Sequence, residues 1–100
     1  TTEESMINKI KRVRLHGSAL RELNTAIHER DGNRCVICGQ YVQPGEKFHH
    51  EPPGAGKSDE LKKGVTLCFS CHAARHFGAN GTLIRAQIVA YLSRLYGETR

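Results

Sequence analysis

The sequence has little with which to build a large apolar core. It contains no Trp and only three Phe, and hydrophobic residues make up 38% of its 100 positions. A chain of this length forms one domain and buries only about two-thirds of the surface that its unfolded chain exposes. So thin a core favours an additional cross-link, and a bound metal ion is one way to supply it.

Long apolar runs, repeats and low-complexity segments are also missing. No stretch is long enough to span a membrane, and residues 1–5 are polar and acidic with no apolar run behind them. We therefore expect no membrane partner and a reducing, cytoplasmic (intracellular) location. In such a compartment, paired cysteines bind metal more often than they form disulfides.

A phosphate-binding P-loop is lacking as well, although Gly54-Ala-Gly56-Lys57-Ser58 invites the comparison. The motif needs a glycine five positions before Gly56, and Glu51 stands there. No long apolar strand precedes it either. These two departures argue against nucleotide hydrolysis.

What the sequence does have is a dense cluster of metal-binding residue types between Cys35 and His76. All four cysteines lie there as two C-x-x-C pairs, together with four of the six histidines. A structural zinc site takes four soft ligands in tetrahedral geometry. We predict that one structural Zn²⁺ is bound by Cys35, Cys38, Cys68 and Cys71, with two disulfides or a redox pair as the alternatives.

The spacing of the two pairs indicates what lies between them. Residues 39–67 separate the pairs, more than a zinc ribbon usually has, so another element is inserted. A knuckle at 34–39, a hairpin and a helix bearing the second pair describe a treble-clef layout. We expect strands at 41–42 and 47–50 around a turn at 43–46, a short strand at 65–67, and a helix starting near Cys71.

The histidines indicate a second metal site. His72 and His76 are four residues apart on the predicted helix, so their rings can converge, and His49 and His50 come from the strand before. Neutral imidazole suits Zn, Mn, Fe or Ni better than Mg or Ca. Fewer than four protein ligands leave positions for water and substrate. The alternative is a group of polar surface histidines beside a zinc finger.

Three helices are predicted around this cluster. One covers about 2–14 and carries a basic run, one covers about 19–30 after a Ser18 cap and ends at 31–33, and one covers about 82–96. The apolar stripe of the helix at 19–30 consists of Leu20, Leu23 and Ile27. The apolar face of the helix at 82–96 consists of Leu83, Ile84, Ile88, Tyr91, Leu92 and Leu95. His16 and His28 lie outside the cluster, and we expect both on the solvated surface.

The net charge of +5 and the pI near 9.3 favour an anionic partner. The basic run at 9–14 is either an arm that contacts phosphates or an ordinary solvated helix.

The combined pattern resembles the HNH endonucleases. Its parts are the lead-in 29–35, C-x-x-C-G, His-His at a strand end, and Leu-Cys-x-x-Cys-His-x-x-x-His, which together cover about residues 28–78. The resemblance implies a small α+β fold, with a ββα-metal (treble-clef, His-Me finger) core and flanking helices. Together with the chain length and the predicted helices, it leads us to expect one nuclease domain over 1–100, with a basic arm at 1–17, the core and its lead-in helix at 18–78, and a packing helix at 79–100.

The resemblance assigns roles to single positions. It places His49 and His72 at metal-ligand positions, His76 at a ligand position that only some relatives occupy, and His50 at the general-base position. The usual asparagine falls at Lys63, whose ammonium has donors but no acceptor. Our hypothesis is that backbone contacts orient the base and that Lys63 offsets charge near the scissile phosphate. An inactive member of the family is the alternative.

The expected function is a metal-dependent DNA endonuclease that hydrolyses phosphodiester bonds, with a catalytic Mn²⁺, Mg²⁺, Zn²⁺ or Ni²⁺. The predicted phosphate contacts are Lys9, Lys11, Arg12, Arg14, Lys57, Lys62 and Arg75. One such site cuts one strand, so a monomer nicks DNA and a homodimer cuts both strands. The alternative is a non-catalytic zinc module that binds DNA or protein.

Overall fold

A computed structural model of the chain describes residues 12–97. Within them, the protein is a small, compact α+β structure with three α-helices and one two-stranded sheet. The order of elements is α2 (Gly17–Arg30), β1 (His49–His50), two short 3-10 helices (Gly54–Gly56 and Leu61–Lys63), β2 (Gly64–Val65), α3 (Phe69–Phe77) and α4 (Gly81–Tyr96). None of the described helices is long and apolar enough to cross a membrane.

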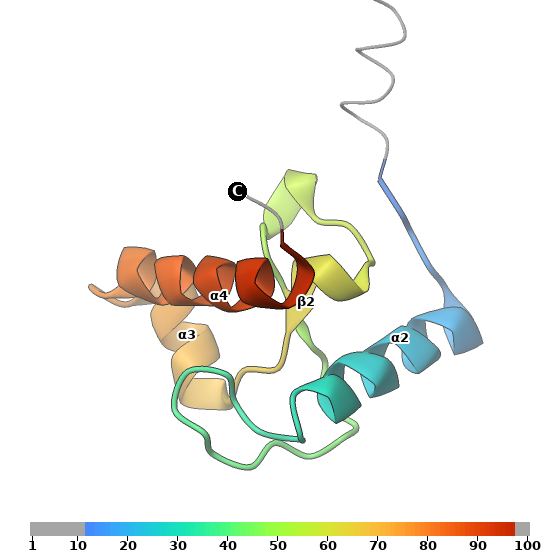
Figure 1. The fold of residues 1–100 in the computed structure, drawn as a ribbon, viewed down its shortest axis with the longest axis horizontal. Coiled ribbons are helices and arrows are strands. Elements are labelled where there is room, and N and C mark those ends of the chain that lie inside the picture. The colour runs from blue at the N-terminus through green and yellow to red at the C-terminus, as the bar shows by residue number, and fades with distance from the viewer. Residues whose placement is uncertain (1–11, 98–100) are drawn as a thin grey trace, which may run out of the picture.

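The short sheet lies between the helices. In Figure 1, α2 lies on one side of β2, while α3 and α4 pack against each other on the other side. Strands β1 and β2 are antiparallel, with His49 opposite Val65 and His50 opposite Gly64. This pairing brings the adjacent histidines next to the segment that leads into the second cysteine pair.

The hairpin predicted for 41–50 is not formed. Tyr41 makes an isolated bridge with Arg34, and β1 pairs with β2 instead. The turn itself is confirmed, since the Glu46 N–H donates to the Gln43 carbonyl at 3.0 Å. The Asn24 side chain explains the difference, because it accepts from the Phe48 N–H (2.9 Å) and donates to the Glu46 carbonyl (3.0 Å). The turn therefore docks on α2.

Helix α2 ends where the sequence predicts and begins earlier. Gly32 (φ 69°) and Asn33 (φ 58°) adopt the left-handed conformation that ends the helix. At the start, Gly17 is already helical and His16 is the N-cap without a side-chain hydrogen bond, so the predicted Ser18 cap is wrong.

His28 is not on the surface as predicted. Its side chain is buried on α2 beside Ile27, and its Nε2 lies 2.6 Å from the Glu46 carbonyl. The docked turn covers this part of the helix, which the sequence pattern does not reveal. His16 is exposed, as predicted.

Helix α4 has the predicted bounds to within one residue but a narrower buried face. Ile84, Ile88 and Leu92, spaced by four, are buried, whereas Leu83 and Leu95 are 58% and 47% exposed. Including those two leucines in the packing face was therefore wrong. The buried residues join Cys35, Val42, Val65, Leu67 and Cys68 in one hydrophobic core.

A buried carboxylate ties α2, the sheet and α4 together. Asp31 accepts hydrogen bonds from the Tyr91 hydroxyl (2.5 Å), the Thr66 N–H (2.8 Å) and the neighbouring Arg30 guanidinium (2.8 Å). Arg30 also donates to the Gly64 carbonyl at 2.7 Å. Burial, followed by the bond to Asp31, raises the pKa of Tyr91 to about 12. This network fixes the position of β2 relative to both long helices.

The sheet also requires a glycine. A Cβ at Gly64 would lie 2.6 Å from the Phe48 ring and 2.7 Å from the Ile27 side chain. These contacts are too short for any side chain, so the close approach of β2 to Phe48 and α2 depends on Gly64.

The N-terminal arm is only partly described. Lys9 and Lys11 lie outside the described residues, so the predicted helix is tested only at its end, where residues 12–16 are not helical. The Arg12 guanidinium instead donates to the Ala55 carbonyl. Residues 13–15 run beside Ser58 and Asp59, with the Asp59 N–H donating to the Val13 carbonyl at 2.9 Å.

Candidate functional site

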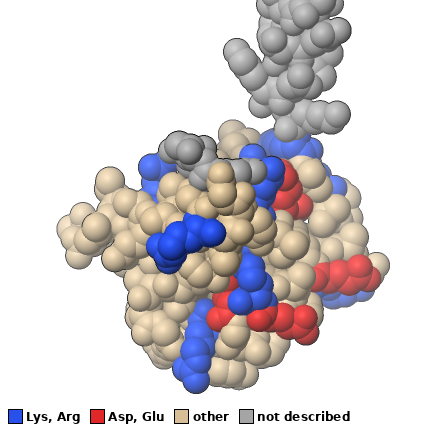
Figure 2. Space-filling view, in the orientation of Figure 1, with Lys and Arg blue, Asp and Glu red and all other residues tan. Residues whose placement is uncertain are grey.

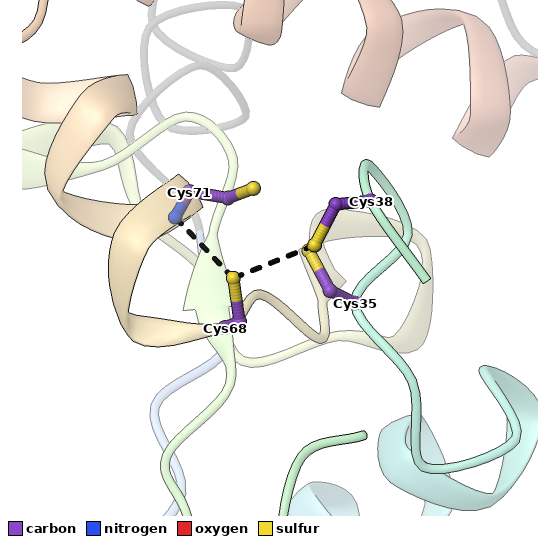
Figure 3. A group of neighbouring side chains, drawn as sticks. All are labelled: Cys35, Cys38, Cys68 and Cys71. Atoms are coloured by element: carbon purple, nitrogen blue, oxygen red, sulfur yellow. Dashed lines mark hydrogen bonds between the residues drawn. The ribbon is translucent and has the colours of Figure 1, made fainter. Parts of the chain in front are cut away.

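The four cysteines come together from the two knuckles. Cys35 and Cys38 lie on the loop after α2, and Cys68 and Cys71 lie at the start of α3 (Figure 3). Their sulfurs are all within 4.8 Å of one another, and all four are free of disulfides. Helix α3 begins at Phe69, two residues before the predicted start, because Cys68 is its N-cap and its sulfur accepts from the Cys71 N–H.

Sulfur spacing in this cluster suits zinc. The Sγ atoms of Cys38 and Cys68 are 3.7 Å apart. Two thiolates at about 2.3 Å from a tetrahedral Zn²⁺ lie about 3.8 Å apart, whereas a disulfide needs about 2.05 Å. The cluster can therefore bind one structural zinc.

Backbone groups favour a thiolate at this site. Burial of Cys35 opposes ionisation, but hydrogen bonds from the backbone N–H groups of Cys38, Cys68 and Ile37 outweigh it and lower the pKa of Cys35 to about 7. Burial raises the pKa of Cys71, whose neighbours are the other thiols. A bound cation would stabilise all four thiolates together.

Three histidines from β1 and α3 form a second cluster. His49 comes from β1, and His72 and His76 come from successive turns of α3. One ring nitrogen of each lies within 4.8 Å of the others. The Nε2 atoms of His72 and His76 are 3.1 Å apart, close to the roughly 3.4 Å expected for two ligands of one tetrahedral ion. Burial and the neighbouring His49 lower the pKa values of His72 and His76, which favours the neutral form of both rings.

A buried carboxylate supports this cluster. Glu51, 2% exposed, lies 3.0 Å from His49 Nε2 and makes a bidentate ion pair with Arg75 at 3.0 and 2.9 Å. Burial opposes its charge, but the bonds from His49 and Arg75 hold the pKa of Glu51 at about 2. With Nε2 of His49 directed at the carboxylate, Nδ1 is the nitrogen left to bind a metal. Carboxylates support metal-binding histidines in this way.

Arg75, predicted as a phosphate contact, is engaged elsewhere. Two of its guanidinium nitrogens are bonded to Glu51, and its side chain is only 14% exposed. Its role in this conformation is to fix the carboxylate behind His49.

His50 is not a member of the three-histidine cluster. Its Nε2 lies 2.7 Å from Asp59 Oδ1, and its ring packs against Phe48 with centroids 4.6 Å apart. Burial opposes the charge of Asp59, but bonds from His50 and the Leu15 N–H lower its pKa. Adjacent residues of a strand face opposite ways, which gives His49 and His50 different surroundings.

Lys63 contacts two glutamates, Glu60 and Glu51. It lies in the second 3-10 helix, with its Nζ 4.0 Å from a Glu60 carboxylate oxygen. Its backbone carbonyl accepts from the Glu51 N–H at 3.0 Å. Lys63 is therefore connected to the residue that follows β1 through its main chain.

A groove of about 770 Å³ connects the histidines to α2. His49, His50, His72 and His76 line it, as do four basic side chains, namely Arg14, Arg21, Lys47 and Lys57. Arg14 and Lys57 were predicted as phosphate contacts, whereas Arg21 and Lys47 were not. Lys62 lies in the second 3-10 helix and does not line the groove. On the face shown in Figure 2, basic and acidic side chains are interspersed rather than gathered into one patch.

Comparison with known proteins adds no relative. Neither models of protein families, nor curated proteins, nor solved structures gave a match to this chain.

The sequence pattern did not identify Glu51 and Asp59 as parts of the site. Glu51 is two positions after His49, hence on the same side of the strand, so the alternation offered a signal for it. Asp59 reaches His50 across a loop with no periodic pattern, and only the folded chain reveals it.

Proposed function

We propose that the protein is a metal-dependent endonuclease that hydrolyses phosphodiester bonds in DNA, in a ββα-metal arrangement of the HNH type. The observation that carries the proposal is the convergence of His49, His72 and His76 from β1 and α3, beside a fourth histidine in a groove lined by basic residues. The HNH-like sequence pattern supports the same assignment.

The residues of the cluster fit a divalent metal. Three imidazoles supply nitrogen donors suited to Zn, Mn, Fe or Ni, and the Glu51 carboxylate lies within hydrogen-bond distance of His49. Three protein ligands leave room for water and a phosphate oxygen. When bound, the metal would supply Lewis-acid stabilisation of the charge that grows on the phosphate in the transition state.

The remaining steps belong to the chain's own residues. His50 removes a proton from the attacking water, a step for which histidine is the side chain that enzymes use most often. Its Nε2 is directed at Asp59, so Nδ1 is the nitrogen that takes the proton. Arg14 and Lys57 hold flanking phosphates in the groove, which gives affinity without sequence choice.

Lys63 takes no direct part in this proposal. Its ammonium is near Glu60, and its carbonyl pairs with the Glu51 backbone. The sequence hypothesis assigned the orientation of the base to backbone contacts, whereas the partner of His50 Nε2 is the Asp59 side chain. Charge compensation by Lys63 is not used.

The test is relaxation of a supercoiled plasmid with added Mn²⁺ or Mg²⁺. We expect cleavage by the wild type, a loss of at least about 100-fold in His50→Ala, and no loss in Gln87→Ala, an exposed α4 position. Equal activity in wild type and His50→Ala would point to a contaminating nuclease. DNA binding without cleavage would favour the non-catalytic zinc module.

A further inference from the structure

Asp59 connects the proposed general base to the N-terminal segment. One carboxylate oxygen lies 2.7 Å from His50 Nε2, and the other accepts the Leu15 N–H at 2.8 Å. The backbone N–H of Asp59 donates to the Val13 carbonyl at 2.9 Å. Asp59 is therefore fixed through both its side chain and its main chain by residues 13–15, which we call the strap.

The strap has a second point of attachment on the same loop. The Val13 N–H donates to Ser58 Oγ at 2.8 Å, and Ser58 is 2% exposed. Alternating hydrogen bonds therefore run from residues 13 and 15 to residues 58 and 59. Contacts of this number and burial hold the Asp59 carboxylate in one place.

A carboxylate that is fixed in this way selects one form of the His50 ring. Ionised aspartate only accepts hydrogen bonds, so His50 Nε2 must carry the proton that it donates. Nδ1 is then unprotonated and available as a base. Hydrogen bonds with an ionised partner are among the stronger ones in proteins, so the selection is effective.

We propose that Asp59 is a positioning residue that holds His50 in the Nε2–H tautomer, and that the strap is part of the active site because it fixes Asp59. The effect that we expect on catalysis rests on the proposed function, since it takes His50 as the base. The assignment of the His50 tautomer does not depend on that function. The inference also accounts for Lys63, because a base oriented from Asp59 does not need an asparagine at position 63.

The first test is spectroscopic and independent of cleavage. In zinc-loaded protein labelled with ¹⁵N histidine, long-range ¹H–¹⁵N spectra above pH 7 should show His50 as the Nε2–H tautomer, with its signals assigned from His50→Ala. In Asp59→Ala, the His50 signals should shift toward a mixture of tautomers. Unchanged His50 signals in Asp59→Ala would overturn the proposal.

The second test is kinetic. Asp59→Ala should lower kcat at least about tenfold with little change in KM, because an orienting partner of a base acts on the chemical step. Asp59→Glu should recover part of the loss. Lys57→Ala, which alters the adjacent groove residue, should mainly raise KM. An equal kcat in Asp59→Ala and wild type would refute the positioning role, whereas absence of cleavage in the wild type would refute only the proposed function.

The strap is tested by removing one N–H. Leu15→Pro deletes the donor to Asp59, whereas Leu15→Ala removes the side chain and keeps the donor. Leu15→Pro should change the His50 signals in the same direction as Asp59→Ala, and Leu15→Ala should not. Identical spectra for the two Leu15 variants would exclude a role for the strap. If Leu15→Pro does not fold, Ser58→Ala, which removes the acceptor of the Val13 N–H, takes its place with the same expected shift.

Discussion

Cys71 and His72 are consecutive residues of α3, yet they belong to two clusters with opposite properties. The cysteine cluster joins the start of α3 to the first knuckle, and Cys35 and Cys68 are part of the hydrophobic core. The histidine cluster joins α3 to β1 and lines an open groove. Both draw on one nine-residue helix.

Under the proposed function, this difference separates a structural site from a catalytic site within one small domain. Successive helical residues point about 100° apart, so one short helix can serve a closed site and an open one. Four soft ligands complete the coordination of a structural ion, whereas three imidazoles leave positions unfilled. The first cluster should therefore govern folding and the second should govern activity.

The largest expected effect follows from breaking the cysteine cluster. Cys68→Ser removes a buried ligand, and structural zinc contributes about 10–16 kcal/mol in zinc-finger peptides. We expect loss of bound zinc and of cooperative thermal unfolding, measured by elemental analysis and circular dichroism. A Cys68→Ser protein that melts like the wild type would contradict the structural role of the cluster.

Breaking the histidine cluster should spare the fold. His72→Ala should reduce cleavage at least about 100-fold, because one of three imidazoles is lost, while the melting temperature changes by only a few degrees. Calorimetric titration with Mn²⁺ should show binding in the wild type and none in the variant. Loss of folding in His72→Ala would show that the two clusters are not separable.

Glu51→Gln should affect both activity and stability, because this carboxylate supports His49 and pairs with Arg75. Removing one partner of a buried ion pair costs about 3–5 kcal/mol, which denaturant unfolding would measure. Arg85→Ala is the matched control, since this half-exposed side chain lies 3.5 Å from the same carboxylate and should cost less than about 1 kcal/mol. Equal costs in the two variants would argue against a central role for the Arg75 pair.

The smallest effect should come from Tyr91, which belongs to neither cluster and whose hydroxyl donates to Asp31. Its pKa is raised from 10 to about 12 in the fold. Its contribution to the free energy of unfolding is therefore complete below pH 10 and is lost as the pH rises from 10 to 12.

Tyr91→Phe should cost about 1–2 kcal/mol at pH 7, because the Asp31 carboxylate loses a hydrogen bond. It should also lack the alkaline loss of stability between pH 10 and 12. Tyr41→Phe, at an exposed position, is the control. The same alkaline slope in Tyr91→Phe and wild type would assign that loss to other groups.

Local patterns predicted the parts of the fold that depend on local interactions. The end of α2 at Gly32 and Asn33, the C-x-x-C knuckles and the bounds of α4 all follow from residues close in sequence. The convergence of His72 and His76 is equally local, because it depends only on helical spacing.

The errors arise where a distant side chain decides the outcome. Asn24 on α2 forms hydrogen bonds with the turn before Phe48 and holds it against the helix. The predicted hairpin therefore does not form, and His28 is buried beneath the turn. Asp59 meets His50 only because the loop folds back onto the strap. The phosphate contact of Arg75, assigned from its charge and its place next to the site, stays a prediction, but its ion pair with Glu51, 24 residues away, was not foreseen. No periodicity in the sequence encodes these contacts.

The most direct test of two separable sites is selective removal of metal. Mild chelation should leave one zinc per chain and a native circular dichroism spectrum but abolish plasmid cleavage, and added Mn²⁺ should restore cleavage without changing the spectrum. Cleavage that persists with one zinc per chain, or that disappears only when the fold is lost, would contradict the assignment of the histidine cluster as a separate catalytic site.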